Sequence, residues 1–156
     1  MTGMKRIITY ISLILVISFL CGCSKPVGFQ DVENIVSVDF FFDDGGEYNY
    51  SFDLEKGVFS ADCLDESMEY TIEQTEIEAI RAAIEPARGW SGDYRHTSGG
   101  LNYPQRYSIV LTYADGTECE LNGTSANGRK WPEGFEELKS TLDNIVQVRS
   151  SNAEQT

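Results

Sequence analysis

Two glycine-containing segments, residues 88–105 and residues 123–134, concentrate the side chains that could recognise a ligand. A connection as long as the first, without regular periodicity, is often functional. Aromatic faces suit sugars or peptides, and guanidinium groups suit carboxylates. The pattern therefore predicts a binding site more readily than a catalytic centre. The candidate ligand-binding residues are Trp90, Tyr94, Arg95, His96, Arg129 and Trp131.

The tryptophans and the histidine also have structural interpretations. Trp131 precedes Pro132 and could pack as a hydrophobic staple against a closing helix. Trp90 could cap the core after the first helix. His96 is the single histidine of the chain, and no G-x-S-x-G nucleophile pattern accompanies it, so nucleophilic catalysis has little support. We assign no catalytic residue and no cofactor.

Carboxylates dominate the charge of the chain, since 25 Asp and Glu residues against 12 Lys and Arg residues give a net charge of −13. Most lie at turns or on the polar side of alternating segments, which indicates a solvated acidic surface. Residues 43–47, Asp-Asp-Gly-Gly-Glu, could bind calcium weakly, but their spacing is not that of an EF-hand loop, and we predict no metal site. Phosphate backbones repel so acidic a domain, so nucleic acid is not an expected partner.

The N-terminal segment has the composition of an export signal. Lys5 and Arg6 precede an apolar run over residues 7–20, and residues 20–23 read Leu-Cys-Gly-Cys. A transmembrane anchor is the alternative, but a helix of this run would span roughly 21 Å, short of a hydrocarbon core of roughly 30 Å. The segment resembles the signal peptide and lipobox of bacterial lipoproteins. The resemblance implies cleavage before Cys23 and a diacylglycerol on its thiol, which anchors stably because two acyl chains insert.

This resemblance implies an extracytoplasmic protein of the bacterial cell envelope. The lipid on Cys23 would hold it to the cell membrane, or to the outer membrane of a Gram-negative cell. Its expected partners are the membrane, through that lipid, and an envelope protein or a cell-wall glycan or peptide. The expected organisation is a signal peptide over residues 1–22, a lipidated cysteine and tether over 23–34, one domain over 35–149 and a disordered tail over 150–156.

Two further cysteines, Cys63 and Cys119, are a candidate disulfide, because exported proteins can keep one. Both fall on apolar sides of predicted strands, so they could instead be small buried hydrophobic residues.

Periodicity predicts the elements that must position these residues. Alternating apolar residues indicate strands near residues 36–42, 48–54, 58–63, 107–113 and 117–121, with another short strand over 67–72. Apolar residues at helical spacing indicate helices over residues 75–85 and 135–145. The order β-β-β(-β)-α-β-β-α predicts an α+β fold, with an antiparallel sheet of about five to six strands and two helices packed on one face.

Turn chemistry predicts the register of both hairpins. A two-residue loop at Lys56-Gly57 would place Leu54 opposite Phe59. A three-residue loop ending in a left-handed Gly116 would place Leu111 opposite Cys119.

The C-terminal part, from the hairpin turn at Asp115-Gly116 through Trp131 into the last helix, resembles small uncharacterised lipoprotein domains of Gram-positive gut bacteria. That group transfers no catalytic residue. We expect a non-enzymatic binding or interaction module of the cell envelope. The alternatives are a small cell-wall-acting hydrolase that uses loop carboxylates near Trp90, and an acidic inhibitor or accessory protein for a cationic partner.

Overall fold

The structure is a computed structural model that describes residues 28–153, apart from residues 64–65, 91, 97–103 and 127–129. The predicted export segment with Cys23, and the candidate ligand-binding residue Arg129, lie outside the described residues. No helix within the described part is long and apolar enough to cross a membrane.

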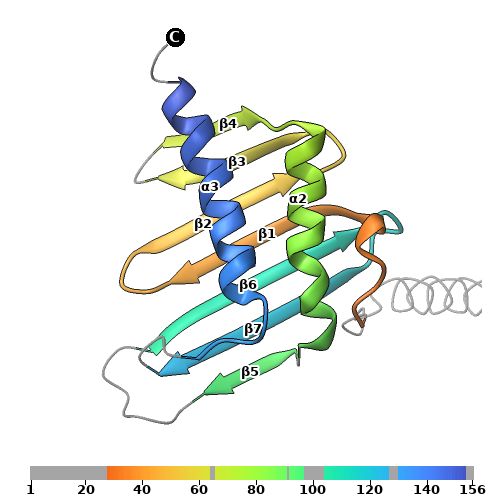
Figure 1. Ribbon diagram of the computed structural model, residues 1–156, viewed down its shortest axis with the longest axis vertical. Coiled ribbons are helices and arrows are strands. Elements are labelled where there is room, and N and C mark those ends of the chain that lie inside the picture. Colours follow the sequence, from red (N-terminus) through yellow and green to blue (C-terminus); the bar gives the residue numbers. More distant parts are fainter. Residues whose placement is uncertain (1–27, 64–65, 91, 97–103, 127–129, 154–156) are drawn as a thin grey trace, which may run out of the picture.

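One seven-stranded sheet organises the chain, in the order β4-β3-β2-β1-β6-β7-β5 (Figure 1). Every neighbouring pair is antiparallel except β5 and β7, which run parallel. The strands are β1 (Ile35–Asp43), β2 (Glu47–Asp53), β3 (Val58–Cys63), β4 (Glu66–Thr71), β5 (Asp93–His96), β6 (Pro104–Tyr113) and β7 (Glu118–Ala126). The α+β class is therefore confirmed, but the sheet is larger than predicted and is mixed.

The unpredicted strand is β5, which lies in the segment expected to be a loop. This strand has only four residues, and they alternate between exposed and half-buried. Its sequence therefore lacks the alternation of apolar and polar residues that predicts a strand. Backbone pairing to β7, together with the hydrogen bond from the Asn122 N–H to the Gly92 carbonyl (3.0 Å), holds it at the sheet edge.

Two helices, α2 (Gln74–Ile84) and α3 (Phe135–Ala153), lie side by side on one face of the sheet (Figure 1). Short 3₁₀ turns, η1 (Val32–Asn34) and η2 (Glu85–Gly89), precede β1 and follow α2. The predicted apolar stripes are confirmed, since the residues on them are buried. They are Ile77, Ile80, Ala83 and Ile84 in α2, and Phe135, Leu138, Leu142 and Ile145 in α3. α3 continues to Ala153, past the predicted domain boundary at residue 149.

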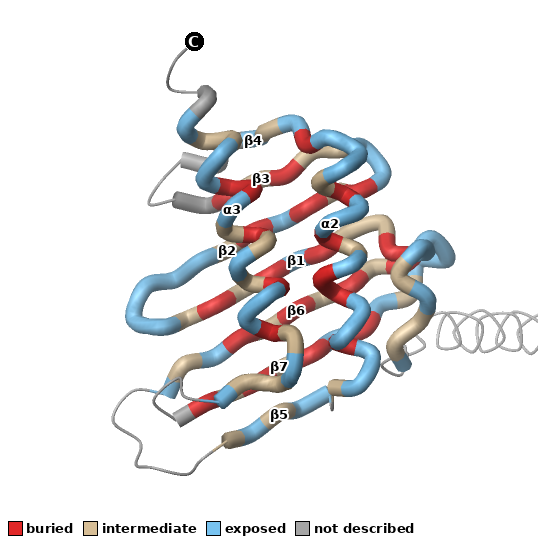
Figure 2. Tube along the Cα trace, viewed as in Figure 1, coloured by how far each residue is buried: buried red, intermediate tan, exposed pale blue. Residues whose placement is uncertain are grey.

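The core lies between the helices and the sheet, where alternate strand residues are buried (Figure 2). In β1, Val38, Phe40 and Phe42 point to this core as predicted. The start of the strand differs, because a register shift between Ile35 and Ser37 turns Ile35 inward. Val36 is therefore only half-buried.

The second hairpin has the predicted register, with Leu111 opposite Cys119 and a positive φ of 78° at Gly116. The predicted register of the β2–β3 hairpin is wrong by two residues, because Phe52, not Leu54, lies opposite Phe59. The loop is longer because Asp53 accepts hydrogen bonds from the backbone N–H groups of Lys56 (2.9 Å, side chain) and Gly57 (2.9 Å, carbonyl). A two-residue shift leaves every side chain on its predicted face.

The candidate disulfide is contradicted, because Cys119 is a free and buried cysteine. Strands β2, β1 and β6 lie between β3, which ends at Cys63, and β7, which carries Cys119. Four strand spacings separate these strands by roughly 19 Å, whereas the Cα atoms of a disulfide lie within about 7 Å. Burial raises the pKa of the Cys119 thiol, which keeps it protonated.

Residues 28–34, expected to be part of the tether, contact the domain. The Gln30 N–H donates to the Tyr113 hydroxyl (3.1 Å), and the Gln30 side chain donates to the Thr117 hydroxyl (2.8 Å). The Arg88 guanidinium lies 5.2 Å from the centroid of the Phe29 ring. The ordered domain therefore begins before β1.

Candidate functional site

The two tryptophans of the predicted site lie together as core packing. Trp90 and Trp131 contact the Tyr107 ring at 5.9 and 5.6 Å between centroids, and both contact Phe135. The Trp90 indole N–H donates to the Glu133 carbonyl (2.8 Å). Trp131 packs 4.8 Å from Phe135, the first residue of α3, so it does pack against the closing helix. The contact is not a hydrophobic staple in the strict sense, because Trp131 lies two residues before the N′ position.

The remaining predicted residues do not join these rings in one pocket. Tyr94 and His96 pair in register with Gly123 and Ser125, on the side of the sheet that the helices cover. Arg95 lies on the other side and forms an ion pair with Asp93 (2.9 Å). The described members of the predicted site are thus divided between two faces of the sheet.

Tyr107 and Gly123 were not predicted, although they organise the tryptophan cluster. A Cβ on Gly123 would lie 2.1 Å from the Tyr107 ring, so glycine is required beneath it. The Tyr107 hydroxyl is buried and has no hydrogen-bond partner in the described part of the chain. Burial, with smaller contributions from Tyr94 and Asp93, raises the pKa of Tyr107 far above its ordinary value. This phenol stays neutral and acts as a packing group.

The candidate surface that the structure adds is the other side of the sheet, which we call the open face. It consists of the strand residues that point away from α2 and α3, and no described element covers it (Figure 1). Cations on it are Arg95 and Arg106. Carboxylates on it are Asp39, Asp43, Glu47, Asp53, Glu69, Asp93, Glu118 and Glu120.

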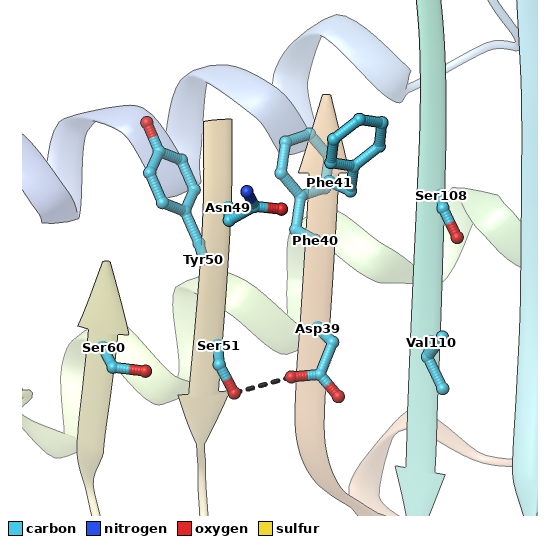
Figure 3. A pocket seen from close by; sticks show the side chains of 9 residues that line it. All are labelled: Asp39, Phe40, Phe41, Asn49, Tyr50, Ser51, Ser60, Ser108 and Val110. Atoms are coloured by element: carbon cyan, nitrogen blue, oxygen red, sulfur yellow. Dashed lines mark hydrogen bonds between the residues drawn. The ribbon is translucent and has the colours of Figure 1, made fainter. Parts of the chain in front are cut away.

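Phe41 stands near the middle of the open face and interrupts its polar pattern. In Figure 3, which looks onto the strands with both helices behind them, Phe41 lies on β1 between Asn49 of β2 and Ser108 of β6. A hollow of about 380 Å³ adjoins it on the side of β2, and one of about 280 Å³ adjoins it on the side of β7. Phe41 was visible in the sequence as the apolar exception among Ser37 and Asp39.

The cations near the open face are already bound to carboxylates of the chain. Arg106 donates to Asp43 (2.8 Å), and this hydrogen bond lowers the pKa of Asp43. Lys56, from the β2–β3 turn, donates to Asp53 (2.7 Å) and lowers the pKa of that carboxyl in the same way. Within the described residues, no salt bridge reaches Asp39, Glu47, Glu69, Glu118 or Glu120.

The side chains of the described residues that could do chemistry are spread over both faces of the sheet. No group of three or more His, Cys, Asp or Glu residues among them could hold a metal ion. In the turn considered for calcium, Asp43 and Asp44 accept hydrogen bonds from the backbone N–H groups of Gly45 and Gly46. Ser51 donates to Asp39 (2.6 Å) on the open face, but the single histidine of the chain, His96, shares the opposite face with Ser125.

Comparison with known proteins gave no match, since no family model fits the sequence and no curated protein or solved structure matches it.

Proposed function

We propose that the chain is a lipid-anchored, non-enzymatic interaction module that binds a partner in the bacterial cell envelope through its open face. The observation that supports this binding surface is the contrast between the two sides of one sheet. Helices cover one side (Figure 1), where the aromatic residues are buried, whereas the other side is uncovered, acidic and hollowed around Phe41 (Figure 3).

The anchor is the lipid on Cys23 implied by the lipobox resemblance. Since Phe29 already packs on the core, only the segment between Cys23 and Phe29 separates lipid from domain. Six residue steps reach at most roughly 21 Å when extended. The partner would therefore lie close to the membrane surface. Cys23→Ala should leave the precursor uncleaved and without fatty acid; normal processing and release of this variant would contradict the anchor.

Site-specific photocrosslinking in intact cells tests the binding surface. A photoreactive amino acid at Ser108, on the open face, should give a discrete adduct. The same amino acid at Ser140, exposed on α3, is the matched control and should give none. Adducts from position 140 alone, or equal adducts from both positions, would contradict binding through the open face.

A cell-wall hydrolase is the competing function, and no specific observation favours it. Asp93, the carboxylate nearest to Trp90 in the sequence, forms an ion pair with the exposed Arg95. Release of reducing ends from purified cell wall, abolished by Asp93→Asn, would replace the binding proposal.

A further inference from the structure

We propose that the open face binds an extended, arginine-containing polypeptide segment that crosses the strands, with a partner guanidinium over Phe41. This inference rests on the proposed function, because it names the partner of the same surface. It draws on three features: the continuity of the hollows, the excess of carboxylates around them and the lack of a cation–π contact to Phe41 among the described residues.

The hollows of the open face form a series that crosses the sheet. Ser51 and Ser60 line both the hollow over β2 and β3 and the hollow beside Phe41. Phe41 and Ser108 line both that hollow and the next one toward β7. The series therefore runs perpendicular to the strands, from β3 to β7.

Short side chains explain the depth of this series. Ser60 of β3, Ser51 of β2 and Asp39 of β1 are direct neighbours in register across the sheet. Long polar side chains could occupy such solvated positions and would fill the hollows, but these three side chains are short. Crossing from β3 to β7 takes four strand spacings, or roughly 19 Å. An extended polypeptide rises about 3.3 Å per residue, so roughly six residues would fill the series.

Charge selects the occupant. Glu69 lies at one end of the series and Asp39 near its middle, and among the described residues no salt bridge reaches either carboxylate. Asp93 lies at the other end, where Arg95 pairs with it. Lys56 and Arg106 also line the two end hollows, but Asp53 and Asp43 already bind them, so these ion pairs add no net charge. A cationic segment is therefore attracted to the β3 end and to the middle of the series, whereas an anionic one is repelled there.

The Phe41 ring, at the centre of the series of hollows, favours an arginine of the partner at that position. On the helix side of the same strands, Lys139 of the chain itself lies 5.0 Å from the centroid of Phe42 and 5.3 Å from that of Tyr48. The cation–π contacts of the described residues include none to Phe41. A planar guanidinium can stack on such a ring while it donates to a nearby carboxylate such as Asp39.

Fluorescence anisotropy with a labelled hexa-arginine peptide tests the proposal on the full chain, purified with its lipid in neutral detergent at physiological salt. Phe41→Leu keeps an apolar side chain but removes the ring, and should weaken binding about fivefold to tenfold. Tyr48→Leu, which removes an exposed ring on the other side of the sheet, should leave the affinity unchanged. Hexa-lysine should bind the parent chain several times more weakly than hexa-arginine.

Single-charge variants separate a site from general attraction. Asp39→Asn should weaken binding about threefold or more, and Glu137→Gln, on the exposed side of α3, should change it far less. Equal losses from the open-face and control variants would overturn the proposal, as would hexa-lysine binding as well as hexa-arginine. A peptidoglycan fragment that binds in a Phe41-dependent manner, where hexa-arginine does not, would also overturn it.

The two proposals can fail separately. Crosslinking from position 108 without any Phe41-dependent preference for arginine would retain the open face as the binding surface and refute its arginine-containing occupant. Crosslinking from position 140 alone would refute the open face itself, and this inference with it.

Discussion

The two faces of the sheet differ most clearly at adjacent residues of β1. Phe40 is 2% exposed and stacks with Tyr50 and Phe42 beneath the helices, whereas Phe41 points to the uncovered side and lines two hollows. The same residue type thus stabilises the fold at one position and, in our proposal, is left for recognition at the next. The comparison teaches that a binary pattern assigns the core face, and that exceptions on the polar face are the candidates for function.

The largest expected effect separates these two phenylalanines. Phe40→Ala should lower the free energy of unfolding by about 3–5 kcal/mol, because it leaves a cavity in the core. Phe41→Ala should cost less than about 1 kcal/mol, since surface substitutions seldom cost more. Urea unfolding of both variants gives the comparison, and equal losses would mean that the open face is packed as tightly as the core.

The next effect concerns the close contact under the tryptophan cluster. Gly123→Ala forces the Tyr107 ring to move and should cost about 1–3 kcal/mol. Gly89→Ala is the control, because a Cβ there meets nothing within 4 Å. Thermal melts of the two variants should differ, and a Gly123→Ala protein as stable as Gly89→Ala would show that the ring does not lie over this residue.

A smaller effect depends on pH. Burial opposes ionisation of Glu76, but hydrogen bonds from Arg149 (2.6 Å) and from the Glu73 N–H (2.7 Å) lower its pKa below the ordinary 4.5. The ionised carboxylate therefore stabilises the fold above that pH, and the stabilisation is lost as the pH falls through the folded-state pKa.

Glu76→Gln should consequently cost about 1–2 kcal/mol at neutral pH and progressively less in acid. Denaturant unfolding of parent and variant between pH 7 and pH 3 measures the difference. Asp43→Asn, which removes the exposed ion pair with Arg106, is the counterpart on the open face and should change stability little. A Glu76→Gln deficit that does not shrink in acid would contradict the assignment.

The smallest effect is a gain. Tyr107→Phe removes a buried hydroxyl without a described partner, and should stabilise the fold by about 1 kcal/mol at neutral pH. The gain should grow above about pH 10, because the unfolded tyrosine then ionises while burial keeps the folded one neutral. Tyr113→Phe should instead destabilise, since Tyr113 accepts a hydrogen bond from the Gln30 N–H. Calorimetry that finds Tyr107→Phe destabilising would reveal a partner for this hydroxyl.

Local patterns predicted the parts of the fold that they determine alone. The apolar stripes of α2 and α3 and the second hairpin, with its left-handed Gly116, follow from spacing and turn chemistry. The β2–β3 loop was predicted too short, because the sequence does not show that Asp53 accepts the two hydrogen bonds that close the longer loop. Strand β5 was missed because pairing to β7, and not its own residues, makes it a strand.

The candidate site was predictable only in part, for the same reason. The sequence placed aromatic residues near both loops, but could not show that Trp90 and Trp131 pack on Tyr107. The open face depends on strand order, because Ser60, Ser51 and Ser108 come from β3, β2 and β6. Spacing along the chain does not reveal that these residues line one surface.

The most direct test of the open face as a binding surface is oxidative footprinting of the unmodified chain. Phe41 and Tyr48 are aromatic side chains on opposite sides of the sheet, and mass spectrometry can compare their labelling in intact envelopes with that in the purified chain. We predict that Phe41 labelling falls severalfold in the envelope while Tyr48 labelling stays the same. Unchanged labelling of Phe41, or an equal fall at both residues, would contradict the account.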